Sequence, residues 1–117
     1  MITNFEEITT EITAQELLLI PTIVQSFKKY TINNPIKSDE ICLRFNNSKV
    51  SKINLDGPRL RKIVHYIRKN SLLPLIATSK GYYVSDDVDE IKKQINSLTE
   101  RANSNMECAN GLKKFIK

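Results

Sequence analysis

Apolar side chains recur with helical spacing in the middle of the chain, over residues 57–70. At about 100° per residue, four of them form one narrow face, in which the last three lie within about 60° of the first on a helical wheel. These four are Leu60, Ile63, Val64 and Ile67. Asp56 or Gly57 is suited to cap the helix, and Pro58 is tolerated in its first turn because the missing N–H has no partner there. The pattern predicts a helix with one narrow buried face.

The rest of the circumference of this helix is polar or cationic, and no acidic residue interrupts it. It carries Arg59, Arg61, Lys62, His65, Tyr66, Arg68 and Lys69. A basic face of this kind is found on surfaces that contact a polyanion, and also on ordinary solvated surfaces. The helix taken alone leaves both interpretations open.

Two further helices are predicted upstream. Residues 13–16, Thr-Ala-Gln-Glu, have the form of a capping box and predict a helix from about Thr13 to Tyr30, bent in the middle by Pro21. Residues 33–35, Asn-Asn-Pro, are a stop and a turn. Ser38 then caps a short second helix with acidic residues in its first turn. The apolar residues of that helix leave its buried face undefined.

The segment after residue 70 changes from helical to strand-like patterning. Residues 75–78 and 82–84 are rich in strand-forming side chains. They are separated by Ser79, Lys80 and Gly81, and the glycine can adopt positive φ in a tight turn. We therefore expect a two-stranded β-hairpin.

Residues 86–117 predict one long helix that Asp86 and Asp87 cap. Positions spaced alternately by three and four residues form an apolar seam over four heptads. The seam consists of Val88, Ile91, Ile95, Leu98, Ala102, Asn105, Ala109, Leu112 and Ile116. It is either a homodimeric coiled coil, with Asn105 setting the register, or a face that lies back on its own domain. At 1.5 Å per residue this helix is roughly 40 Å long, which is more than a domain of this size could cover, so its length slightly favours association.

Charge is distributed unevenly along the 117 residues, whose net charge is +5. Residues 28–85 contain twelve lysines and arginines against three acids, a local charge of +9, whereas residues 1–27 contain four acids and no base. A basic block of this kind suits the neutralisation of phosphates on a polyanion. The chain is long enough for one small domain and one additional long element.

Other function classes find little support in the sequence. There is no apolar run near the ~18 residues that span a membrane and no signal-peptide pattern, so we expect a cytoplasmic protein. Cys42 and Cys108 are distant from each other, and His65 is the only histidine. We therefore expect no metal site and no disulfide. Without a phosphate-binding glycine loop or a recognisable nucleophile and base, we expect neither a cofactor nor enzymatic activity.

The order helix, helix, basic helix and hairpin resembles a winged helix-turn-helix domain. The most specific part is LRKIVHYIRKNSLLPLIATSKGYYVS, residues 60–85. It is similar to the recognition helix and wing of small proteins encoded by bacteriophages and mobile elements. The expected fold class is mainly α with a small β-hairpin. The expected organisation is an acidic segment at 1–12, a winged-helix domain at 13–85 and a long helix at 86–117.

The resemblance implies a double-stranded DNA-binding protein, which we expect to be a phage-type transcriptional regulator or replication accessory. The apolar seam of the long helix adds the expectation of a homodimer. Residues 57–70 would enter the major groove, and the wing at 74–84 would lie along the DNA backbone or in the minor groove. The expected base-edge residues are Arg59, Lys62, His65 and Tyr66. The expected backbone residues are Arg61, Arg68 and Lys69, with Lys80 at the wing tip and Ser38 at a phosphate-accepting helix start.

Several of these side chains have a second interpretation that involves no DNA. Arg61 and Arg68 border the apolar stripe and could extend over the core. Tyr66 could pack under the wing, and Lys80 could serve only to keep an exposed hairpin edge soluble. The alternative function is a protein-interaction module, a phage-like inhibitor or adaptor that binds a host or defence protein or a nucleoprotein complex. Its working surfaces would be the winged helix and the C-terminal helix.

Overall fold

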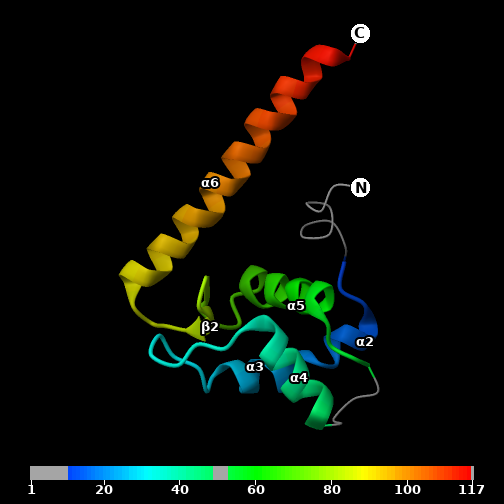
Figure 1. The fold of residues 1–117 in the computed structure, drawn as a ribbon, viewed down its shortest axis with the longest axis vertical. Helices are drawn as coiled ribbons and strands as arrows, with labels where there is room; N and C mark the ends of the chain where they lie inside the picture. Colours follow the sequence, from blue (N-terminus) through cyan, green and yellow to red (C-terminus); the bar gives the residue numbers. More distant parts are fainter. Residues whose placement is uncertain (1–10, 49–52, 117) are drawn as a thin grey trace. The chain divides into compact units, whose positions relative to one another are not determined.

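The computed structural model describes residues 11–48 and 53–116 (Figure 1). The chain forms two compact units, Met1–Ser85 and Asp86–Lys117. The prediction of a mainly helical chain with a two-stranded hairpin and a long C-terminal helix is confirmed. None of the described helices is both long and apolar enough to cross a membrane.

The first predicted helix is divided into two, α2 (Ala14–Leu17) and α3 (Ile20–Phe27). The capping box before α2 forms as predicted. The expectation of one bent helix reaching Tyr30 is wrong, because the chain turns between α2 and α3. Pro21 lies in the first turn of α3, where it removes no hydrogen bond, so it helps to begin a helix instead of bending one.

The second predicted helix, α4 (Ser38–Ser48), already includes the residue expected to cap it. The Ile41 N–H donates to the carbonyl oxygen of Lys37 at 3.1 Å, so Lys37 holds the cap position and Ser38 is the first helical residue. The buried face consists of Ile41, Cys42 and Phe45, while Leu43 is 60% exposed. Packing against the rest of the unit thus defines the face that the sequence left open.

The basic helix, α5 (Gly57–Lys69), forms with the predicted cap and the predicted core face. Asp56 accepts a hydrogen bond from the Arg59 N–H at 2.9 Å, and Pro58 lies in the first turn. The four apolar residues of its core face, Leu60, Ile63, Val64 and Ile67, are at most 4% exposed. Fully burying a side chain of this kind stabilises the fold by roughly 1.5–3 kcal/mol.

The C-terminus of α5 directs the chain into the hairpin. Ser71 has a positive φ of 56°, the left-handed conformation that commonly follows the last helical turn. The Leu72 N–H donates to the Ile67 oxygen at 2.9 Å, and the Ser71 N–H donates to the Arg68 oxygen at 3.1 Å. These two bonds are a Schellman motif, here with serine at the position usually held by glycine.

The hairpin consists of β1 (Leu75–Thr78) and β2 (Gly81–Val84), paired antiparallel from Leu75↔Val84 to Thr78↔Gly81. Gly81 has the positive φ that was predicted, 129°. A Cβ at this position would lie 2.5 Å from the Ile36 carbonyl oxygen. Ile36 and Tyr82 exchange two backbone hydrogen bonds of 2.9 and 2.7 Å. The segment before α4 therefore pairs with the hairpin as a short third partner.

The C-terminal unit contains α6 (Val88–Leu112) and a 3₁₀ turn, η1 (Lys113–Phe115). Asp87 caps α6, and its side chain accepts a hydrogen bond from the Asp89 N–H at 2.8 Å. Ile116 follows η1 with extended backbone (φ −89°, ψ 126°). The expected continuation of the seam to Ile116 is therefore wrong, because the helix tightens and ends before that residue.

Candidate nucleic-acid interface

The polar and cationic side of α5, which we call the basic arc, consists of the seven residues Arg59, Arg61, Lys62, His65, Tyr66, Arg68 and Lys69. Two of its cations bind a buried carboxylate from another helix. Glu16, at the capping box of α2, has a side chain that is only 1% exposed. Its Oε2 accepts a hydrogen bond from Arg59 Nε at 2.8 Å, and its Oε1 accepts from Lys62 Nζ at 2.9 Å. The backbone N–H of Thr13 also donates to Oε1, at 2.9 Å. We refer to Glu16, Arg59 and Lys62 as the Glu16 cluster.

The electrostatics of the cluster keep Glu16 ionised. Burial by itself would raise the pKa of this carboxyl group, but the hydrogen bonds from Lys62, from the Thr13 backbone and from Arg59 outweigh burial. The pKa of Glu16 falls from its ordinary value of 4.5 to about 2. The Arg59 side chain is 36% exposed and that of Lys62 is 16% exposed. Two of the four expected base-edge residues therefore hold an internal carboxylate.

A second part of the arc faces the hairpin. Arg68 Nε donates to the carbonyl oxygen of Leu75, in β1, at 3.0 Å. Burial raises the pKa of Tyr82 above its ordinary value, and the positive charges of Arg68 and Arg61 only partly oppose this rise. The Tyr82 ring packs edge-on against Phe27, with ring centroids 5.6 Å apart. Arg68 thus links α5 to the hairpin.

Three residues of the arc form a continuous exposed line along α5. Arg61, His65 and Lys69 follow one another at intervals of four residues, so they occupy one side of the helix. All three are exposed, whereas Tyr66 is only half-exposed. We refer to Arg61, His65 and Lys69 as the exposed stripe. At about 100° per residue, Lys69 lies opposite Leu60 on the helix, and Arg61 lies nearest to the buried face.

The structure brings the start of α4 next to the hairpin. A hollow of about 530 Å³ is lined by Lys37, Ser38, Asp39, Ala77, Thr78, Ser79, Gly81 and Tyr82. Lys80 is exposed in the hairpin turn. Asp39 is one of the lining residues, and its Oδ1 accepts from the Glu40 N–H at 2.9 Å. A phosphate at Ser38 would therefore meet a negative charge as well as the helix N-terminus.

The expected dimerisation seam on α6 is largely exposed. Val88, Ile95, Leu98 and Leu112 have exposed fractions of 61, 54, 39 and 64%. Ala102, Asn105 and Ala109 are exposed too, and Ile91 is half-exposed. An apolar seam of this length on one helix is a surface that a second helix could cover.

Sequence reasoning missed the partnership of Glu16 with α5. The capping box indicated the local role of this residue, and that role is confirmed. Its contact with Arg59 joins residues 43 positions apart, for which the sequence carries no local signal. The charge pattern contained one indication only: an acidic segment followed by a long basic block.

No protein-family model matches this chain, and no curated protein or solved structure matches it.

Proposed function

We propose that this protein binds double-stranded DNA through the exposed stripe of α5, with the hairpin alongside as a wing. The observation that carries the proposal is the line of Arg61, His65 and Lys69 on a helix whose opposite side is buried. A helix fits the major groove, which is about 12 Å wide, and a stripe of this kind would point into it. The bridge between Ile36 and Tyr82 supports the winged-helix resemblance, because it ties the hairpin to the helical core.

Within this proposal the contacts differ in kind. Arg61 has the planar guanidinium that can donate two hydrogen bonds to a guanine edge. Lys69 and Lys80 are suited to phosphates, which position a protein without reading sequence. Arg59 and Lys62 remain with Glu16, since a shift of either cation to a phosphate would weaken the partnering of a buried charge. The proposed role is that of a phage-type transcriptional regulator or replication accessory.

A mobility-shift experiment on duplex DNA tests this function. The double variant Arg61→Glu and Lys69→Glu should lose most binding. The control is Lys92→Glu and Lys93→Glu, which changes the net charge equally on two exposed lysines of α6. The control should retain clearly more affinity than the stripe variant. Wild-type affinity in the stripe variant, or equal loss in both, would contradict the assignment.

Salt dependence gives a second measurement on the same variants. Each phosphate contact contributes about −0.9 to the slope of log K against log salt. The stripe variant should therefore have a shallower slope than wild type by roughly one for each lost phosphate contact. Reversal of Arg59 and Lys62 is a poor test, because it would surround the buried Glu16 with two further carboxylates and destabilise the fold.

We also propose that the seam of α6 makes the protein a homodimer. Light scattering on the variant Ile95→Glu and Leu98→Glu should give the monomer mass. Asn96→Glu and Asn103→Glu add the same charge one position after the seam residues Ile95 and Ala102, and should leave the dimer intact. A dimer that survives the seam variant would rule out the coiled coil.

The alternative is a protein-interaction module, and one observation favours it. Leu18 is 79% exposed between α2 and α3, and Leu43 is 60% exposed on α4, so the first unit carries large apolar side chains in contact with water. Purification of a tagged chain with and without nuclease separates the two functions. A protein partner retained after nuclease, together with no shift of duplex DNA, would favour the module.

A further inference from the structure

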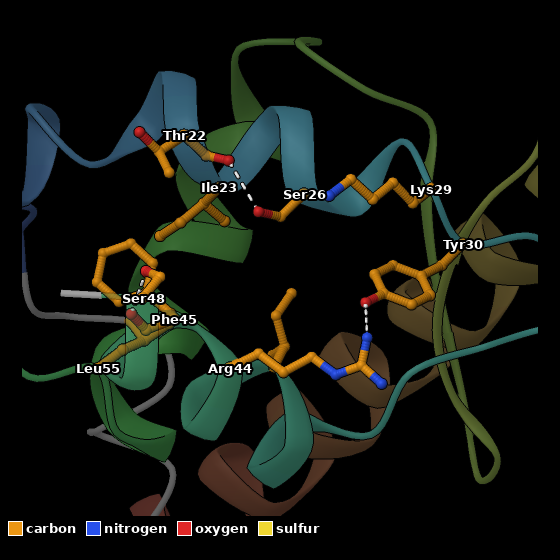
Figure 2. Close-up of a pocket in the computed structure, with 10 residues that line it drawn as sticks. Thr22, Ile23, Ser26, Lys29, Tyr30, Arg44, Phe45, Ser48 and Leu55 are labelled. Atoms are coloured by element: carbon orange, nitrogen blue, oxygen red, sulfur yellow. Dashed lines mark hydrogen bonds between the residues drawn. The ribbon is translucent and has the colours of Figure 1, made fainter. Parts of the chain in front are cut away.

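A second hollow lies between α3 and α4 and has an apolar floor. Its volume is about 210 Å³ (Figure 2). The apolar lining consists of Ile23, Ile41, Phe45 and Leu55. Each of these side chains is at most 7% exposed, so they belong to the core of the first unit and present only part of their surface to the hollow.

Cationic and hydroxyl groups surround this floor. Arg44 extends toward Tyr30, and its Nη1 donates to the Tyr30 hydroxyl at 3.0 Å (Figure 2). Lys29, just after the end of α3, lines the hollow from the side of that helix. The hydroxyl groups of Ser26 and Ser48 donate to helix carbonyls at 3.0 and 2.7 Å. Those two protons are committed, and the charged donors in the lining are Lys29 and Arg44.

The wall at Leu55 is held in place before any ligand arrives. Asn46 Nδ2 donates to the Leu55 carbonyl oxygen at 2.9 Å, and the Leu55 N–H donates to Asn46 Oδ1 at 2.7 Å. This pair of bonds joins α4 to the chain just before α5. A wall fixed in this way lowers the entropic cost of binding.

We propose that this hollow binds a small organic carboxylate with a compact apolar body. The body would lie on Ile23, Ile41 and Phe45. The carboxylate would accept hydrogen bonds from Arg44 and Lys29, an arrangement that the planar guanidinium favours. The volume is below the ~300–1,000 Å³ of sites for drug-sized ligands, so the ligand has few non-hydrogen atoms.

The charge of the lining discriminates between ligand classes. An uncharged apolar molecule would leave the two cations unused, and inorganic phosphate would leave the apolar floor unused. Glu40 lies 3.4 Å from Arg44 Nη2, but both side chains of that pair are about half or more exposed. Exposed ion pairs of this kind are weak, and a guanidinium has five donor hydrogens, so Arg44 can still donate to a ligand.

The test is an NMR titration of the full chain with benzoate, and with benzamide as the uncharged analogue. Benzoate should shift the amide resonances of Tyr30, Ile41 and Leu55 saturably, with a Kd on the order of 1 mM for so small a ligand. Benzamide should bind at least tenfold more weakly. Lys29→Gln and Arg44→Gln should each weaken benzoate binding several-fold.

Lys28→Gln is the matched control, since Lys28 is an exposed neighbour of Lys29 that does not line the hollow. It should bind benzoate as the wild type does. Three results would overturn the proposal: no saturable shift at these residues, equal affinity for benzoate and benzamide, or equal effects of Lys28→Gln and Lys29→Gln. None of these results depends on whether the protein binds DNA.

Discussion

Replacement of Glu16 by glutamine removes one negative charge from the interior and keeps the shape of the side chain. Arg59 and Lys62 would then face a neutral amide in place of the carboxylate that accepts from both at 2.8 and 2.9 Å. The glutamine can still accept one hydrogen bond from the Thr13 N–H, so the capping box is largely retained. The variant therefore tests the charge of the Glu16 cluster more than its geometry.

The pKa of Glu16 gives the expected magnitude. A carboxyl group whose pKa is 4.5 in the unfolded chain and about 2 in the folded protein stabilises the fold by about 3 kcal/mol, at 1.36 kcal/mol per pKa unit. Loss of one partner from a buried ion pair costs about 3–5 kcal/mol. Since Arg59 is 36% exposed and can be solvated, the lower end is expected. The free energy of unfolding of a domain is only about 5–15 kcal/mol in total, so a loss of about 3 kcal/mol would be readily measured.

The sign of the pH dependence follows from the direction of the shift. The folded protein binds the Glu16 proton less tightly than the unfolded chain does, so the stabilisation is fully present above pH 4.5. It is lost as the pH falls from 4.5 toward 2. The difference in stability between wild type and Glu16→Gln should therefore be about 3 kcal/mol at pH 7 and should shrink across that range.

Urea unfolding followed by circular dichroism from pH 7 to pH 2.5 measures both quantities. Glu40→Gln is the control, because it removes an exposed carboxylate that pairs with Arg44 at 3.4 Å and should cost no more than about 1 kcal/mol. The reasoning is refuted if Glu16→Gln costs as little as Glu40→Gln at pH 7. It is also refuted if the cost of Glu16→Gln does not change between pH 4.5 and 2.5.

Three further substitutions test local features of the first unit, each by urea or thermal unfolding. Ser71→Gly should stabilise the fold by about 0.5–1 kcal/mol, because glycine adopts the left-handed conformation without strain; unchanged or lower stability would contradict this. Gly81→Ala should cost about 2 kcal/mol or more, because its Cβ would lie 2.5 Å from the Ile36 oxygen; wild-type stability would show that this close approach can relax. Asn46→Ala should cost about 2 kcal/mol by removing both bonds to the Leu55 backbone, and a cost near zero would mean that water replaces them.

The predictions from sequence succeeded where the determinants are local. The buried face of α5 follows from four apolar residues at helical spacing, and its start follows from a side chain three residues from the N–H that it caps. The hairpin likewise follows from two strand-forming runs and one glycine with positive φ. Neighbours along the chain decide such features, because helical and strand periodicities relate residues that are close in sequence.

The division of the first helix shows where local reasoning fails. The apolar residues between Leu17 and Val24 continue a helical pattern, and Pro21 could either bend a helix or begin one. Packing decided the outcome: Leu19, Ile20 and Ile23 are buried, while the turn leaves Leu18 exposed. Which apolar residues reach the core depends on the other helices, and the sequence of one segment does not contain that information.

The chemistry of the candidate interface depends on both the local sequence and the tertiary structure. The sequence by itself determined that α5 is basic on one side and apolar on the other. Only the tertiary structure decided that Glu16 forms ion pairs with Arg59 and Lys62. It also decided that Arg68 binds the hairpin backbone, whereas the exposed stripe remains in contact with water. The physical reason is that a charge acts on whatever lies within a few ångströms of it. In a folded chain that neighbour can be 43 residues away.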